Sequence, residues 1–116
     1  MKRSILVLGL LAALTATAVT AQENPYAGVD PTGQEVVFWH VHEGANGEAL
    51  EAIVEEFNQT NEYGITVVAE TQGHYGDLFQ KMLPLLGTQD VPDLVLAYQN
   101  QAATYQLADA LVDMRP

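Results

Sequence analysis

The sequence has 116 residues, of which fifteen are acidic and four are basic, and its formal net charge is −11. A surface this acidic repels nucleic-acid phosphates and anionic lipid headgroups, which argues against nucleic-acid binding and against a peripheral membrane role. The absence of cysteine excludes disulfides and a cysteine nucleophile.

The first 21 residues have the pattern of an export signal peptide. Lys2 and Arg3 form a basic start, residues 5–14 are an apolar run too short to span a bilayer, and small residues precede Ala21. We predict cleavage after Ala21 and a periplasmic or extracellular product. No cysteine follows the apolar run, so we expect no lipid anchor.

Residues 22–34 contain Asn-Pro and Asp-Pro pairs and few apolar side chains, which predicts a flexible leader. The continuous apolar run 36–39 then predicts a strand that is covered on both faces. After a polar loop, apolar residues at i, i+3, i+4 and i+7 predict an amphipathic helix with Asn46 as its N-cap. These apolar residues are Leu50, Ile53, Val54 and Phe57. We interpret the four glutamates between them as a solvated face.

The same strand-and-helix unit recurs twice. Residues 65–69 predict a second strand, and an apolar stripe formed by Tyr75, Leu78, Phe79, Met82 and Leu86 predicts a helix after it. Pro84 should kink or end that helix, because it lacks an amide donor. Residues 93–97 predict a third strand. A short helix follows, with Ala103, Leu107, Ala110 and Leu111 expected on its covered side.

The resulting order β-α-β-α-β-α predicts an α/β fold with a parallel sheet and helices on both faces, a three-layer arrangement. The folded part is expected over residues 35–116. Three strands leave two open sheet edges, which invite further strands. We therefore interpret this unit as part of a larger sheet.

All three strand-to-helix loops should open at one edge of such a sheet, where ligands bind in α/β proteins. The candidate ligand-binding side chains in these loops are Trp39, His40, His42, Glu43, Asn46, Gln72, His74, Tyr75, Asp77, Tyr98, Gln99 and Asn100. Aromatic rings cover the apolar face of a sugar, and fixed polar groups bind its hydroxyls. The pattern predicts a neutral polyhydroxylated ligand and no cofactor.

Two alternatives remain open. His40, His42, Glu43 and His74 could supply nitrogen and oxygen ligands to zinc in a stand-alone exported metal-binding or small-ligand module, although no HExxH spacing occurs. A small secreted hydrolase would depend on Glu43. The one serine, Ser4, lies in the signal peptide and no G-x-S-x-G turn occurs, so we expect no enzyme activity.

Besides the export signal, three segments can be compared with known proteins: VVFWHVHEGANGEALEAIVEEFN, YGITVVAETQGHYGDLFQKM and VPDLVLAYQNQAATYQLADALVDM. Together they resemble the start of an extracellular solute-binding protein of family 1. These are the sugar-binding components of ABC importers. Within the family, FWHVHEG and G-x-Y before a helix are similar to glycerol-3-phosphate and oligosaccharide binders. The resemblance covers about residues 35–114.

The resemblance implies the first part of lobe 1 of a two-lobed, class II periplasmic-binding-protein fold, truncated here. It implies a sugar or sugar-derivative ligand, the membrane permease subunits of an ABC importer as partners, and a monomer when full length. Trp39, His40, Glu43, Tyr75 and Tyr98 match the family's ligand-facing positions. A second lobe would supply the opposite wall, so we expect residues 1–116 alone not to bind sugar tightly.

Overall fold

The computed structural model describes residues 26–115; the predicted signal peptide and the first residues of the leader lie outside this range. The helices and strands alternate as predicted. In chain order they are β1 (Glu35–His40), α1 (Gly44–Thr60), β2 (Thr66–Thr71), α2 (Tyr75–Met82), the 3₁₀ turn η1 (Leu83–Leu85), β3 (Leu94–Val95) and α3 (Gln99–Leu107).

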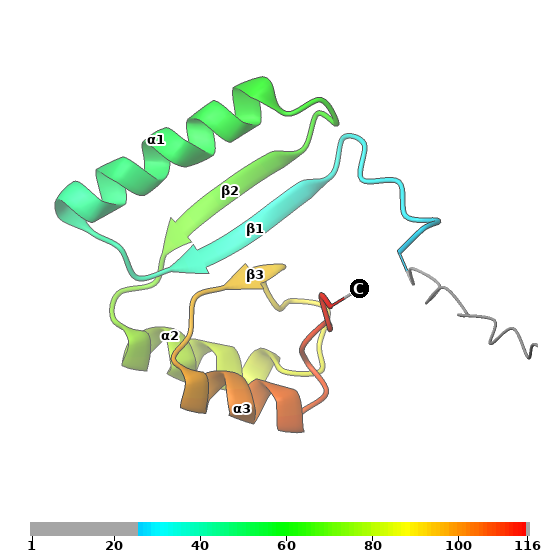
Figure 1. Ribbon diagram of the computed structural model, residues 1–116. Helices are drawn as coiled ribbons and strands as arrows, with labels where there is room; N and C mark the ends of the chain where they lie inside the picture. The colour runs from blue at the N-terminus through cyan, green and yellow to red at the C-terminus, as the bar shows by residue number, and fades with distance from the viewer. Residues whose placement is uncertain (1–25, 116) are drawn as a thin grey trace, which may run out of the picture.

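The three strands form one parallel sheet in the order β2-β1-β3. Val36 of β1 lies opposite Val67 of β2, and Phe38 lies opposite Leu94 of β3. Helix α1 covers one face of the sheet, and α2 and α3 lie against the other (Figure 1). The predicted α/β class and its parallel sheet are therefore confirmed.

The hydrophobic core lies between the sheet and the pair α2 and α3. Among the described residues, its buried apolar side chains are Leu78, Met82 and Tyr105, and Trp39 of β1 packs against them. Side chains of a strand alternate between its two faces, so Trp39 points to this core while His40 points to the α1 side. Val95 of β3 also packs against this core, which therefore joins two strands to α2 and α3.

The α1 side of the sheet is less well covered than predicted. Ile53 is 64% exposed and Phe57 is 41% exposed, so the predicted apolar stripe of α1 is buried only in part. The helix contacts mainly β2, so one strand supplies most of the cover for the stripe. The predicted N-cap was also wrong: α1 begins at Gly44, with Glu43 at its N-cap, rather than at Asn46.

Side chains form hydrogen bonds with backbone groups of β2 and β1 that no neighbouring strand pairs. The Asn58 side chain donates to the carbonyl of Val67 (2.9 Å) and accepts from its amide (2.7 Å), which pairs one residue on the outer edge of β2. On the other side, the Asp93 carboxylate accepts from the amide of Val37 at 2.8 Å. β3 covers only Leu94–Val95, which is shorter than the predicted 93–97, so it does not reach Val37. The carboxylate therefore bonds the amide that a longer strand would pair. Pro92, just before Asp93, has no amide hydrogen to donate to a sheet.

The second and third helices differ in how well the sequence predicted them. Helix α2 ends at Met82 and continues as η1 around Pro84, as expected. The predicted covered side of α3 is wrong: Leu107 is 91% exposed, whereas Gln101 and Tyr105 are buried. No helix within residues 26–115 has the length and apolar character needed to cross a membrane.

Tyr105 offers a direct test of the core. Its hydroxyl is buried and has no hydrogen-bond partner among the described residues, and burial raises its pKa. Replacing Tyr105 by Phe removes this unsatisfied group and keeps the ring, so we expect the free energy of unfolding to rise by about 1 kcal/mol. Urea denaturation of both proteins measures the change.

Leu78→Ala is the matched comparison, because it removes buried apolar volume from the same core. We expect this substitution to lower the free energy of unfolding by about 3 kcal/mol. A Tyr105→Phe protein that is destabilised to a similar extent would contradict the placement of this hydroxyl.

Candidate functional site

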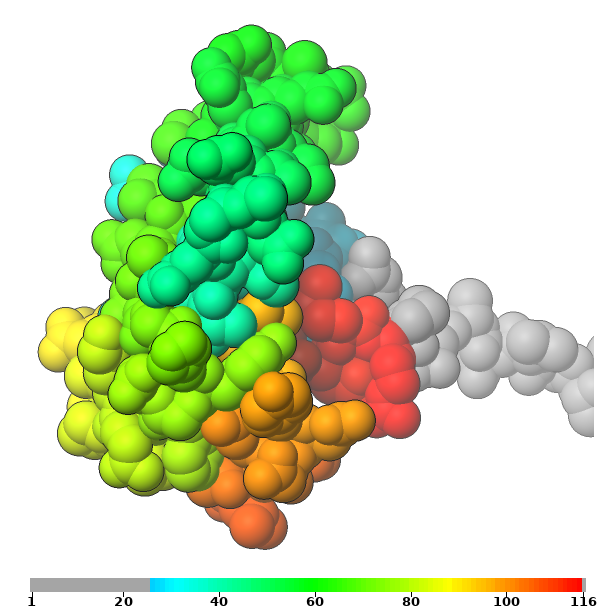
Figure 2. All heavy atoms as spheres, turned by 90° about the vertical axis from the view of Figure 1, so that its left-hand side faces the viewer, coloured from blue at the N-terminus to red at the C-terminus, as the bar shows by residue number. Residues whose placement is uncertain are grey.

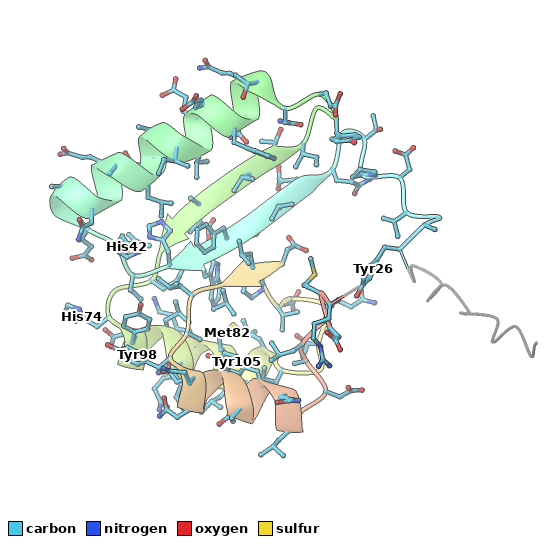
Figure 3. All side chains as sticks on the ribbon, in the orientation of Figure 1. Tyr26, His42, His74, Met82, Tyr98 and Tyr105 are labelled. Carbon is cyan, nitrogen blue, oxygen red and sulfur yellow. The ribbon has the colours of Figure 1, made fainter. Side chains whose placement is uncertain are left out.

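The three loops that follow the strands meet at one edge of the sheet, which we call the rim. It comprises residues 41–43 after β1, 72–74 after β2 and 96–98 after β3. Figure 2 views the molecule from this side, with the start of α1 above the start of α3. His42, His74 and Tyr98 lie along the same edge in Figure 3. The parallel sheet therefore gathers the predicted loops as expected.

Two of the predicted residues come into direct contact. The rings of Tyr75 and Tyr98 stack with their centroids 3.9 Å apart and an angle of 26° between their planes. Tyr75 is the first residue of α2, and Tyr98 is the N-cap of α3. Tyr98 is 52% exposed, whereas Tyr75 is partly buried behind it. The pair therefore offers an aromatic surface supported from one side.

Gln101 holds the two tyrosines in place. Its buried side chain accepts a hydrogen bond from the amide of Tyr98 (3.0 Å) and donates one to the carbonyl of Tyr75 (3.1 Å). The first bond lies within the start of α3, but the second joins α3 to α2. One amide group thus sets the positions of both ring-bearing residues.

His40 and His42 lie on the other side of the sheet, beneath the start of α1. His40 is 4% exposed, and its Nδ1 accepts a hydrogen bond from the amide of His42 at 3.2 Å. The two rings stack with centroids 6.2 Å apart. Burial lowers the pKa of His40, the nearby His42 lowers it further, and Glu51 opposes the shift. His40 is therefore neutral at pH 7.

These histidines line a pocket of about 370 Å³, which we call the histidine pocket. Its walls include His40, His42, Glu43, Gly47, Glu48 and Glu51. Gly47 permits the close approach of α1 to the loop after β1, since a Cβ there would lie 3.1 Å from the carbonyl oxygen of His42. The pocket mixes imidazoles with carboxylates.

The predicted site residues are thus distributed over two places. Tyr75 and Tyr98 form the aromatic pair, and His40 and Glu43 line the histidine pocket. Trp39 belongs to β1 rather than to the loop, contacts the core, and donates from Nε1 to a Glu70 carboxylate oxygen at 3.0 Å. Strand alternation separates Trp39 from His40.

Sequence reasoning missed Gln101 as a site residue. Its position three residues after Tyr98 follows capping-box spacing, a signal that could have suggested its bond to the Tyr98 amide. Asp77 accepts from the amide of His74 in the same way at the start of α2 (3.0 Å). The bond from Gln101 to Tyr75 depends on tertiary structure and left no signal in the sequence.

The metal alternative gains no support from the described residues. Within 26–115, no group of three or more histidine or acidic side chains is arranged to hold a metal ion. Comparisons with protein-family models, curated proteins and solved structures found no match to this chain.

Gln101→Glu tests whether one amide group links α2 to α3. The variant keeps an oxygen for the Tyr98 amide but replaces the donor with a second oxygen that faces the Tyr75 carbonyl. We expect the free energy of unfolding to fall by about 1–2 kcal/mol, because a buried carbonyl loses its partner. We also expect the near-ultraviolet circular dichroism of the stacked tyrosines to weaken.

The control is Gln99→Glu, which makes the same change at an exposed position of α3. It should leave both the spectrum and the stability nearly unchanged. Equal spectra for the two variants would show that Gln101 does not position the tyrosines.

The neutral state of His40 predicts a loss of stability in acid. The pKa of this imidazole is lowered from 6.5 in the folded protein, so the unfolded chain binds the proton more readily. The free energy of unfolding should therefore decrease as the pH falls through 6.5, and the decrease should level off below the folded pKa.

His40→Asn isolates this contribution, because its side-chain oxygen can replace Nδ1 as acceptor for the His42 amide but does not titrate. Unfolding measured between about pH 7.5 and about pH 5 should show a smaller acid-side loss in this variant. His74→Asn, at an exposed position, should retain the full loss. An unchanged pH profile in His40→Asn would exclude the buried imidazole as the cause.

Proposed function

We propose that this chain is the extracytoplasmic, carbohydrate-binding component of an ABC importer and performs no chemistry. The observation that carries the binding role is the stacked pair Tyr75 and Tyr98 at the carboxyl edge of the parallel sheet. In open α/β sheets this edge is where ligands bind. The importer role rests on the resemblance of the sequence to family 1 solute-binding proteins.

The aromatic pair suits a sugar for a physical reason. A pyranose ring has apolar C–H faces that pack against an aromatic ring, while its hydroxyls need hydrogen-bond partners around the edge. Tyr98 is half exposed and is backed by Tyr75, so its orientation is set before a ligand arrives. Because the ring is already ordered, little side-chain entropy remains to be lost on binding.

The polar groups near the rim complement this surface. His74 precedes α2, and Gln99 and Asn100 begin α3 beside Tyr98; all three side chains are exposed. Imidazole and amide groups can both donate and accept hydrogen bonds, which matches the mixed demands of sugar hydroxyls.

For an importer component, binding has to be reported to the membrane permease. In our proposal, a ligand held between this lobe and a second lobe stabilises a closed form, and the permease distinguishes that form from the open one. The class II lobe implied by the resemblance is part of this proposal. The ligand shifts the equilibrium between the open and closed forms only by the contacts that it makes in the closed form and not in the open one.

Removal of the exposed ring tests the proposed function. We expect glucose, galactose or maltose to shift the backbone amide NMR signals of the rim, with a Kd of about 1 mM or weaker, since one aromatic face supplies few contacts. Tyr98→Ala should abolish these shifts. Tyr75→Phe should preserve them, because the backing ring remains.

Tyr63→Ala is the matched control, since Tyr63 is similarly exposed (48%) but precedes β2, at the opposite end of the strand. It should bind sugar like the unmodified chain. Sugar-induced shifts that survive Tyr98→Ala would contradict the proposed role of the aromatic pair.

A further inference from the structure

The outer edge of β2 presents backbone groups that no strand of the described sheet pairs. β2 is an outer strand of that sheet and lies beside β1. The amides of Thr66 and Gln72 donate to the carbonyls of Gln34 and His40, at 2.9 and 2.8 Å. Backbone groups of successive strand residues point to opposite sides, so those of residues 65, 67, 69 and 71 point away from β1. Such an edge is a template for another strand.

Two asparagines bond part of this edge as a neighbouring strand would. The Asn58 side chain donates to the carbonyl of Val67 and accepts from its amide. Asn61, the C-cap of α1, repeats this arrangement at Ile65, where it donates to the carbonyl at 2.9 Å and accepts from the amide at 2.8 Å. A side-chain amide has both a donor and an acceptor, so each asparagine replaces one peptide group of a strand. We call these two residues the asparagine pair.

The asparagine pair is matched to the edge by the geometry of its helix and strand. Asn58 and Asn61 are three residues apart, which places them on the same side of a helix. β2 runs back along α1, so the later asparagine meets the earlier strand residue (Figure 1). Both asparagines are half-buried, and Asn61 also donates to the carbonyl of Phe57 at 2.9 Å, which holds it against the end of α1.

Carboxylates lie along the remainder of this edge. Glu51 and Glu55 line a groove of about 480 Å³ together with Ala69, and Glu51 lines the histidine pocket together with Thr71. Glu70 is the strand residue between these two edge positions. A second copy that paired antiparallel about this point would place Glu70 opposite its own counterpart, and like charges directly opposite each other are destabilising.

We propose that the end of α1 closes the outer edge of β2 to a second copy of this chain. Asn58 and Asn61 take the place of a strand, and the carboxylates repel the copy along the remainder. A second copy is the relevant partner because two identical edges are self-complementary in a two-fold pairing. The sequence predicted two open edges, and the asparagine pair closes part of one. This inference does not depend on the proposed carbohydrate-binding function.

Amide hydrogen exchange tests the asparagine pair in the unmodified chain, with NMR as the readout. After correction for intrinsic rates, we expect the amides of Ile65 and Val67 to exchange at least about tenfold more slowly than those of Ala69 and Thr71. Only the first two donate to a side-chain oxygen. This comparison needs no variant, so it does not depend on how well a variant folds.

The single variants assign each amide to its asparagine. Asn58→Ala should accelerate exchange at Val67 about tenfold and leave Ile65 protected, and Asn61→Ala should have the converse effect. Gln59→Ala is the matched control, because this exposed amide side chain bonds to Glu55 of its own helix at 3.0 Å. It should change neither rate.

The variant that combines Asn58→Ala with Asn61→Ala tests the closure itself. Sedimentation equilibrium should show self-association at least about tenfold stronger than that of the unmodified chain or of Gln59→Ala, because the freed edge can pair. Added sodium chloride should strengthen this association further, since it screens the repulsion between carboxylates. The amides of Ala69 and Thr71 should become protected as the copies pair.

Equal exchange at all four edge amides of the unmodified chain would overturn the role of the asparagine pair. A folded double variant that associates no more than Gln59→Ala would overturn the proposed closure. Association that leaves Ala69 and Thr71 unprotected would also overturn it, because the copies would then meet through another surface. Each of these results leaves sugar binding at Tyr98 to be decided by its own test.

Discussion

The pairing of β1 with both of its neighbours is the constraint on which the rest of the structure depends. β1 lies between β2 and β3 and runs parallel to both, so all three strands end at the same edge. A parallel pairing requires each connection to return across a face of the sheet, and the helices make that return. The rim and its side chains exist because the three connections begin at one edge.

The rim is held together by a small number of polar contacts. Gln101 joins the start of α3 to the start of α2, and the Tyr75–Tyr98 stack packs against this link. The core beneath is compact, with Leu78, Met82 and Tyr105 shared between the two helices. The candidate binding surface therefore lies beside the buried hydrophobic core, which favours a preformed ligand surface.

The two faces of the sheet give the rim two chemically different halves. On the α2 and α3 side, aromatic rings and amides suit the apolar face and hydroxyls of a sugar. On the α1 side, a buried imidazole lies beside exposed carboxylates. Adjacent residues of β1, Trp39 and His40, point to opposite halves because side chains alternate along a strand.

The sequence by itself determined the order of strands and helices, the parallel sheet and the turn at Pro84, because these follow from local periodicity and from backbone chemistry. It also placed Tyr75 and Tyr98 in loops at a common edge. It misassigned the covered side of α3, where Gln101 and Tyr105 are buried in place of Leu107. Tertiary structure decided which side of α3 is covered, because the residues that pack against α3 come from distant parts of the chain. The contact between the tyrosines and the separation of Trp39 from His40 likewise depend on how helices and strands pack, which local sequence does not encode.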